Sequence, residues 1–503
     1  MVKRLCPPGL ILIVIAVFYA RVTGAYFCGY DDFVMTHRAA FEDTRNPSRI
    51  FTTTHFGSSK YRPVSRGLID VFWRLGGGKP MPFRAGSLFF HLAAVAFVYG
   101  IAWLLADSPL VAIAAAILFG LHPIANQSIV ADSFPITTGY ALLLGSFFFF
   151  LYSLRSVRRW RLFLLVSVML LWIGLFTYES TIVEFGFMFG YLAIWRWTGH
   201  PVSRAYLKTL FLASAPVLLM FAVVRHLVVP QAMPLVPLSI QAHNAAMFAA
   251  ALLTPIDLVF ANAIFHTPLP SEIQLNGKFL IEAGISAIVL AVVALAILRR
   301  PGVRARLSGM DWLSMSFLAA CIPLSLTPFL AFTPHPSETY LYPGAAFYAI
   351  VLSLLLWRLL PGQTAYAAVV AGIALLFAAG VLVKNDRVVS CGAAARTILT
   401  QLPTNNWLQG SWHIFLATPP GQEPGPRYGI YGYSGLSSIE VEGVGNRAAE
   451  KAVQMASRND QVIADVVPPA EMAKNCASRG TCFWIFRDGS AHEFIPPAGT
   501  PAR

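Results

Sequence analysis

About eleven apolar runs follow one another between residues 10 and 383, and most are long enough to form a helix that crosses a bilayer. Such a helix takes roughly 17 to 25 residues, because it rises about 1.5 Å per residue through some 30 Å of hydrocarbon. Only 12% of the 503 residues are charged, against roughly 25% in ordinary soluble domains. We therefore expect an all-α polytopic membrane protein.

The expected orientation follows from the basic residues between the runs. The first run, Leu10–Ala20, has a basic start like a signal peptide, but an uncleaved span with a cytoplasmic N-terminus fits the later runs better. Arg-rich loops such as Arg155–Arg161 and Arg299–Arg306 then fall in the cytoplasm, as the positive-inside rule requires. The further spans are predicted at residues 87–105, 109–122, 136–154, 162–178, 180–197, 209–229, 280–298, 312–331, 342–360 and 364–383.

The apolar segment around residues 244–265 breaks this order if it is counted as a full span. It contains Pro255, Asp257 and Asn262, which are easier to accommodate where the backbone faces protein or water than against lipid. We interpret it as an interfacial or re-entrant helix.

The formal net charge of +13 raises nucleic-acid binding as an alternative. However, the Lys and Arg residues gather at the ends of the apolar runs, with no basic stripe interleaved with aromatic residues. Contact with anionic lipid headgroups explains this distribution, so membrane lipid is an expected partner and nucleic acid is not.

Two parts of the chain are predicted outside the membrane, a long first loop at residues 21–86 and a tail at residues 384–503. The tail is rich in Gly, Pro and polar residues and has strand-like runs at Ser438–Glu442 and Cys482–Phe486. We therefore expect a small α+β extracytoplasmic domain after a transmembrane domain of residues 1–383.

The six cysteines show neither a CxxC motif nor the Cys/His spacing of a zinc site, so no thiol-bound metal is expected. Cys476 and Cys482 lie in the tail, where a disulfide is permitted. The sequence leaves a disulfide and a pair of free thiols equally open.

Two adjacent carboxylates, Asp31 and Asp32, come soon after the first span and are the leading catalytic candidates. Adjacent side chains point in different directions, so one can face an acceptor while the other orients backbone or substrate. A carboxylate at a dehydrated interface has a raised pKa, which suits a base that must accept a hydroxyl proton. The alternative interpretation is a helix N-cap or a solvated turn.

The first loop also carries more cations than its acids neutralise, and long loops largely escape the positive-inside rule. An anion such as a polyprenyl phosphate accounts for such an excess, since Arg binds phosphate through paired donors, whereas contact with lipid headgroups is the alternative. The basic residues of the loop include His37, Arg38, Arg45, Arg49, His55, Lys60, Arg62 and Arg66.

Five short motifs occur in order along the chain: YRPV at 61–64, His91, LFGLHP at 118–123, YES at 178–180 and SETYLYP at 337–343. Together they resemble the TMTC-type, PMT-like O-mannosyltransferases, which belong to the GT-C class of membrane glycosyltransferases. The resemblance covers about residues 26–360. It implies a GT-C-like fold, Asp31 or Asp32 of the first outer loop as the base, and a polyprenyl-phosphate sugar, often mannose, as the donor.

The chain departs from that family in three places. Ala125-Asn126-Gln127 stands where the family commonly has His-Thr-Glu, Tyr178 stands at the basic residue of its Lys-Glu motif, and the tail lacks the helical repeats that usually follow. The acceptor and the sugar are therefore not carried over from the resemblance.

Three further residues at the outer membrane edge are candidates for binding the donor phosphate or sugar. His122 ends the third span, and its alternative role is that of a cap or an interfacial residue. Glu179 and Glu338 are carboxylates at the membrane edge, where function is the default hypothesis and pairing with a nearby Arg is the alternative.

The sequence therefore predicts a glycosyltransferase that moves mannose or a similar sugar from a polyprenyl-phosphate donor to a hydroxyl of a protein or glycan acceptor. The reaction is expected on the extracytoplasmic or lumenal face, inverting, with an Asp general base, and with no cofactor or divalent metal required. A bacterial inner membrane is favoured over the endoplasmic reticulum. The alternative class is a multi-span transporter or lipid flippase, which would show paired repeats and ionisable residues at mid-membrane.

Overall fold

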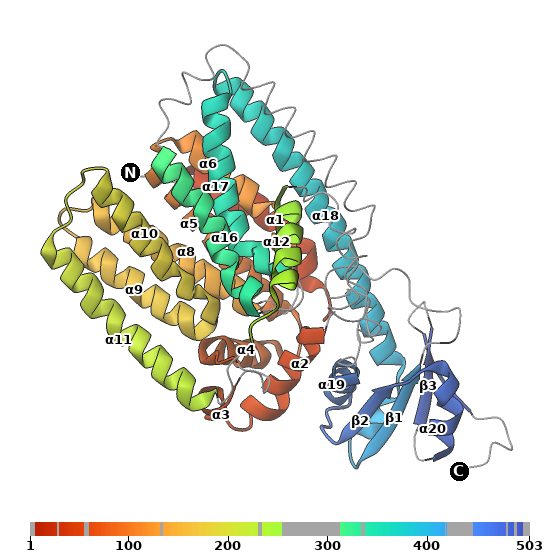
Figure 1. Cartoon of the computed structure of the whole chain (residues 1–503). Coiled ribbons are helices and arrows are strands. Elements are labelled where there is room, and N and C mark those ends of the chain that lie inside the picture. The colour runs from red at the N-terminus through yellow and green to blue at the C-terminus, as the bar shows by residue number, and fades with distance from the viewer. Residues whose placement is uncertain are drawn as a thin grey trace.

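The computed structural model describes residues 6–27, 30–54, 60–130, 134–229, 234–253, 312–332, 338–417, 419, 446–478, 481–486 and 490–495. It consists of a bundle of apolar helices, a set of short helices at one end of the bundle, and a small mixed sheet beyond them (Figure 1).

Within the described residues, seven helices are long and apolar enough to cross a membrane. They are α5 (Met81–Ala106), α8 (Phe134–Arg155), α9 (Trp160–Thr177), α11 (Arg204–Val228), α16 (Trp312–Phe332), α17 (Tyr342–Leu359, counted with the preceding turn) and α18 (Gln363–Gln401). Shorter apolar helices join them in the bundle, namely α1 (Cys6–Tyr19), α6 (Pro109–Gly120) and α10 (Glu184–Trp197).

These helices confirm the predicted fold class, because an apolar helix lies at each predicted span that the structure describes. The predicted span at 280–298 lies outside the described residues. Of the segment at 244–265, the part up to residue 253 belongs to α12 (Leu238–Leu253), and the remainder also lies outside them.

Helices α5 and α8 pack closely at two places where a glycine of one helix faces a phenylalanine ring of the other. A Cβ at Gly100 would lie 2.5 Å from the Phe148 ring, and a Cβ at Gly145 would lie 2.8 Å from the Phe97 ring. Because apolar burial gives helices little reason to associate in lipid, small residues that allow such contacts supply much of the attraction. This packing fixes α8 at the centre of the bundle, where most of its residues are buried.

The first loop is largely helical. It contains α2 (Tyr30–Arg38), a π-helical turn η3 (Ala39–Asp43), α3 (Arg49–Thr52) and α4 (Pro63–Gly76). The turn η2 (Ala20–Gly24) leads into it from α1, and η5 (Glu179–Val183) and η7 (Glu338–Leu341) precede α10 and α17. In Figure 1, α2, α3 and α4 lie at the end of the bundle that faces the sheet.

Helix α18 has 39 residues, about 58 Å at 1.5 Å per residue, which is nearly twice the thickness of the hydrocarbon core. It runs from the bundle to the sheet without interruption (Figure 1). It therefore crosses the predicted boundary between residues 383 and 384 as one helix.

The C-terminal domain, meaning the described residues from 402 onward, contains a four-stranded sheet in the order β2-β1-β3-β4. The strands are β1 (Trp412–Ala417), β2 (Val462–Val466), β3 (Thr481–Ile485) and β4 (Ala491–Glu493); β2 and β3 lie parallel to β1, and β4 is antiparallel to β3. The turns η8 (Thr404–Trp407) and η10 (Pro469–Glu471) and the helices α19 (Asn446–Ser457) and α20 (Met472–Ser478) complete it. Strand β3 matches the predicted run Cys482–Phe486, whereas Ser438–Glu442 lies outside the described residues.

The two faces of strand β1 belong to different cores. Ile414 and Leu416 lie in a cluster with residues of α18 and α19, and Phe415 lies with Met472 of α20 in another. A disulfide joins Cys476 of α20 to Cys482 of β3, so the open question about these thiols is answered in favour of the disulfide.

The first core reaches into the first loop. Phe27 and Phe33 are 2% and 1% exposed and belong to the same cluster as Ile398, Trp407 and Val453. In the segment that carries the acidic pair, a residue before the pair and a residue after it therefore both belong to a core cluster shared with the C-terminal domain.

Helix α18 approaches that segment most closely at Gly392. A Cβ there would lie 2.7 Å from the carbonyl oxygen of Tyr26 and 2.9 Å from its nitrogen. We expect Gly392→Ala to lower the unfolding temperature in detergent by an amount equivalent to about 1–3 kcal/mol, because backbone atoms must move to admit the methyl group. Gly372→Ala, on the same helix with nothing within 4 Å, is the control and should be neutral or slightly stabilising. Equal effects of the two changes would contradict this packing.

Candidate functional site

Asp32 lies in the first turn of α2 and is buried, with 6% of its surface exposed. Its Oδ2 accepts a hydrogen bond of 2.8 Å from Nη2 of Arg84, a buried residue near the start of α5. The same nitrogen donates to the carbonyl oxygen of Tyr26 at 3.2 Å. Arg84 therefore ties both the carboxylate and the chain that enters α2 to the bundle.

A small cavity of about 20 Å³ borders this ion pair. That is room for about one water molecule rather than a sugar. Its lining is mainly apolar, and its residues are Phe27, Asp32, Met35, Thr36, Ile69, Phe83, Arg84, Ser87 and Phe134.

A second ion pair joins two of the predicted residues, Arg62 and Glu179. Arg62 caps the N-terminus of α4, and its Nε donates to Glu179 Oε2 at 2.7 Å; both side chains are largely buried. The other carboxylate oxygen, Oε1, accepts a 2.7 Å bond from the backbone nitrogen of Tyr61. The Arg62 guanidinium carbon lies 4.0 Å from the centre of the Tyr178 ring, so an aromatic face contacts this cation.

More positive charge surrounds Glu179 than it can neutralise. Arg225, near the end of α11, lies 3.8 Å from Glu179 Oε1 through its Nη1, and the charge of Lys60 also acts on the carboxyl group. Burial raises the pKa of Glu179, but the charge and hydrogen bond of Arg62 outweigh it, so this pKa lies below its usual value. With one ionised carboxylate among three cations, this basic cluster (Lys60, Arg62, Glu179 and Arg225) carries net positive charge.

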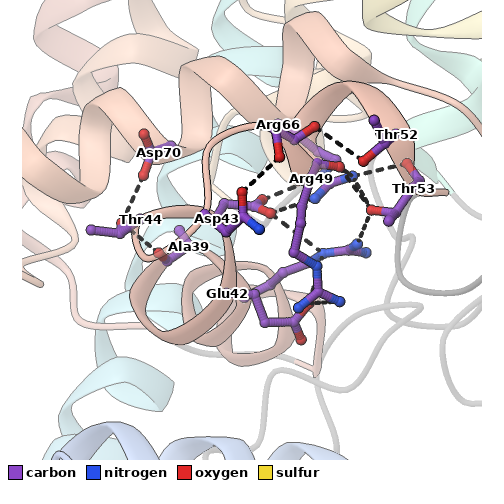
Figure 2. Close-up of polar contacts among 12 residues, drawn as sticks. Ala39, Glu42, Asp43, Thr44, Arg49, Thr52, Thr53, Arg66 and Asp70 are labelled. Carbon is purple, nitrogen blue, oxygen red and sulfur yellow. Dashed lines mark hydrogen bonds and ion pairs between the residues drawn. The ribbon is translucent and has the colours of Figure 1, made fainter.

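A third buried ion pair joins Arg66 to Asp43 within the first loop, as Figure 2 shows. Arg66, one turn after Arg62 on α4, donates to both carboxylate oxygens of Asp43, and its Nη1 donates to the carbonyl oxygens of Arg49 and Thr53. Arg38, the last residue of α2, donates from Nη2 to Thr53 Oγ1 at 2.9 Å. This network fixes the acid-bearing helix α2 relative to the Arg62-bearing helix α4.

The five sequence motifs meet in two groups. YRPV and YES meet at the Arg62–Glu179 pair. Within the bundle, His91 Nδ1 lies 2.9 Å from the hydroxyl of Tyr342, and its Nε2 lies 3.1 Å from the carbonyl oxygen of Gly120, so the other three motifs meet at one imidazole. The first group carries charge at the membrane edge, whereas the second joins α5, α6 and α17.

The remaining predicted residues are placed less completely. Asp31 lies in the first turn of α2 and Glu338 opens η7, but their side chains lie outside the described part of the structure. His55 lies outside the described residues altogether. Among the described residues, no three His, Cys, Asp or Glu side chains gather in a way that could hold a metal ion.

His122 is fully buried in the turn between α6 and α7 (Ala125–Val130). Its Nδ1 accepts a bond from the backbone nitrogen of Ile124 at 3.3 Å, and its ring lies 4.7 Å from that of Phe377. Its contact with the donor stays a prediction.

Sequence reasoning missed Arg84 and Asp43, which lie 52 and 23 residues from their partners Asp32 and Arg66. Arg84 carried one signal, because it lies just before an apolar run in a segment assigned to the outside. Arg225 carried no signal that connects it with Glu179, and only the structure places the two side by side.

No protein-family model matches the sequence, and neither does any curated protein. Solved structures are similar in fold: the crystal structure of ArnT from Cupriavidus metallidurans in the apo state has a TM-score of 0.50 at 11% identity, covering 95% of this chain and 92% of that chain. The same protein bound to undecaprenyl phosphate gives 0.46 at 10% identity over the same shares. The arabinofuranosyltransferase AftD from Mycobacteria gives 0.43 at 13% identity, covering 87% of this chain and 31% of that chain.

The likeness to ArnT shows the fold of this chain, which is that of the GT-C class of membrane glycosyltransferases. The GT-C resemblance stated from the motifs is thereby confirmed at the level of fold.

We expect Arg66→Met to lower the unfolding temperature sharply, by the equivalent of about 3–5 kcal/mol, because it leaves the Asp43 carboxylate buried without its main partner. Arg21→Met is the control, since Arg21 pairs with Asp386 and both side chains have more than half of their surface exposed. An exposed pair of this kind contributes about 0–1 kcal/mol. Thermal unfolding in detergent compares the two, and similar losses would show that the Arg66 network is not a stabilising hub.

The pH dependence of stability should depend on His37, a buried residue of α2. Burial, together with the charge of Lys451, lowers its pKa to about 3, whereas an unfolded histidine titrates near 6.5. The unfolded state therefore binds the proton first, and stability is lost as the pH falls below about 6.5. At pH 5 the loss from this group is about 2 kcal/mol. His37→Gln should flatten the fall in unfolding temperature between pH 7 and pH 5, and an unchanged slope would contradict this assignment.

Proposed function

We propose that this protein transfers a sugar, mannose or a similar hexose, from a polyprenyl-phosphate donor to an acceptor hydroxyl on the extracytoplasmic or lumenal face. The basic cluster carries the proposal, because its excess positive charge lies beside the C-terminal ends of α9 and α11, where the phosphate of a membrane lipid would lie. The GT-C fold and the acidic pair in the first loop support it.

The proposed reaction is a single inverting displacement. An aspartate of the first loop takes the proton of the acceptor hydroxyl, and the oxygen forms a bond to the anomeric carbon as the bond from that carbon to the phosphate oxygen breaks. Polyprenyl phosphate leaves with the bonding electron pair. The charge that develops on its phosphate is stabilised by guanidinium groups fixed in advance.

The two carboxylates divide this work in our proposal. Asp32 is buried and held by Arg84, so it is suited to fixing the start of α2 rather than to receiving a proton. The neighbouring Asp31 is then the general base, in keeping with the different directions that adjacent side chains take on a helix.

Arg62, Arg225 and Lys60 bind the departing phosphate in this proposal, and Glu179 orients Arg62. A lipid monophosphate can be neutralised by these cations, so a divalent metal is not required. His55, His122 and Glu338 remain proposed contacts to the donor. A protein or glycan supplies the acceptor hydroxyl, and a bacterial inner membrane is the favoured location.

The alternative function is a transporter or lipid flippase. It predicts movement of the lipid-linked sugar across the bilayer without a new glycosidic bond. A vesicle assay that follows both the position of a labelled donor and the chemical form of its sugar separates the two.

Asp31→Asn should lower kcat for transfer by about 10²–10⁴-fold, because the acceptor proton loses its base. The substrates are radiolabelled polyprenyl-phosphate sugars with a panel of hydroxyl acceptors, and the protein is purified in detergent. Binding of the donor should stay within about twofold, since the basic cluster is intact. Full activity of the Asp31→Asn variant would refute the assignment of Asp31 as base.

Arg225→Met should weaken the binding of a polyprenyl monophosphate by about tenfold, a loss typical of one charged hydrogen bond. It leaves the Arg62–Glu179 pair in place, so the fold is not at risk. Arg74→Met serves as the control for loss of an arginine elsewhere on the same outer segment. If both variants bind the lipid as tightly as the native chain, the cluster does not bind the donor phosphate.

A further inference from the structure

Helix α2 is too short to hold its own position. It has nine residues, and isolated helices below about 12–15 residues are marginal in water. Its position, and with it that of Asp31 and Asp32, must come from the elements packed against it. One of these is α19 of the C-terminal domain.

The side chain of Thr36 connects the backbone of Asp32 in α2 with helix α19. The hydroxyl oxygen of Thr36 lies 2.5 Å from the carbonyl oxygen of Asp32 and 3.2 Å from Sδ of Met455 on α19. Met455 in turn packs against the core cluster that contains Phe33.

Further contacts with the domain lie before and after Thr36 in the sequence, apolar ones before it and a charged one after it. Phe27 and Phe33 flank the acidic pair in the sequence, and both are buried in the core of the C-terminal domain. Just after α2, Arg45 Nη1 forms an ion pair of 2.7 Å with Asp460, which follows α19. The acid-bearing segment thus contacts this domain through Thr36 and Arg45, and Phe27 and Phe33 belong to a core cluster that includes residues of the domain.

We infer that the C-terminal domain acts as a clamp that positions the acidic pair for transfer, with Met455 as a positioning residue. This inference rests on the proposed function of the acidic pair. The clamp explains why α18 runs as one rigid helix from the membrane to the sheet: it fixes the domain, and therefore α2, relative to the bundle.

Met455→Ala tests the clamp, with Met472→Ala as its matched control. Met472 belongs to the same domain and is fully buried, but it lies in the core on the α20 side of the sheet. We expect Met455→Ala to speed hydrogen–deuterium exchange in peptides covering residues 26–38 and to lower kcat about tenfold, since small misplacements of a catalytic group cost this much or more. Binding of the polyprenyl monophosphate should stay within about twofold.

Met472→Ala should leave exchange in residues 26–38 and kcat within about twofold of the native values, although it removes the more buried side chain. Met455→Leu should restore both. Asp460→Ala, a surface change that does not endanger folding, should also speed exchange in the same peptides. Equal effects of Met455→Ala and Met472→Ala, or unchanged exchange in Met455→Ala, would overturn the clamp.

The exchange measurement needs no turnover, so it separates this inference from the proposed function. If the native chain transfers no sugar from any donor, the proposed function fails, and faster exchange in Met455→Ala alone still supports the clamp. If the native chain is active and exchange is the same in all variants, the proposed function stands and the clamp fails.

Discussion

The end of this bundle that carries the first loop depends on the pairing of buried charge. Four arginines are buried among the described residues, and all but Arg38 pair with a carboxylate distant in sequence: Arg84 with Asp32, Arg66 with Asp43, and Arg62 with Glu179. A lone buried ion costs several kcal/mol. Each pair therefore fixes two elements that are distant in sequence, and together the three pairs determine where the first loop lies on the helices.

Pairing also decides which charges remain for chemistry. Arg66 directs its donors to Asp43 and to two carbonyl groups, so it is a structural hub. The cluster around Glu179 differs, because Arg225 and Lys60 add positive charge to a carboxylate that Arg62 already neutralises. Excess charge of one sign at the membrane edge is costly unless an anion shares the site. In the proposed function, that anion is the lipid phosphate of the donor.

The spans could be predicted from sequence because lipid imposes one strong rule, that the backbone must satisfy its own hydrogen bonds, and apolar length then locates each helix. The Arg62–Glu179 cluster could be anticipated in part, since both residues lie in short motifs on the expected side. Partners such as Arg84 could not, because nothing in a single sequence pairs a carboxylate with a cation 52 residues away. The helices of the first loop were likewise not foreseen, since α2 is short and mostly polar and owes its form to tertiary packing.

The C-terminal tail shows the same limit of prediction from a single sequence. Its packing also changes the interpretation of the segment that carries the acidic pair. Its composition predicted a small α+β unit, but no local pattern revealed that Phe27 and Phe33 of the first loop belong to its core cluster. A domain that only captured an acceptor would have no need to bury side chains on both sides of the acidic pair. Because the proposed base and the phosphate-binding cations lie on different elements, their separation is set by two connections, the Arg66–Asp43 network from α4 to α2 and the α19 contact from the opposite side. Inverting transfer requires the nucleophile and the leaving group on opposite faces of one carbon, so a rigid spacing between these elements is what the reaction needs.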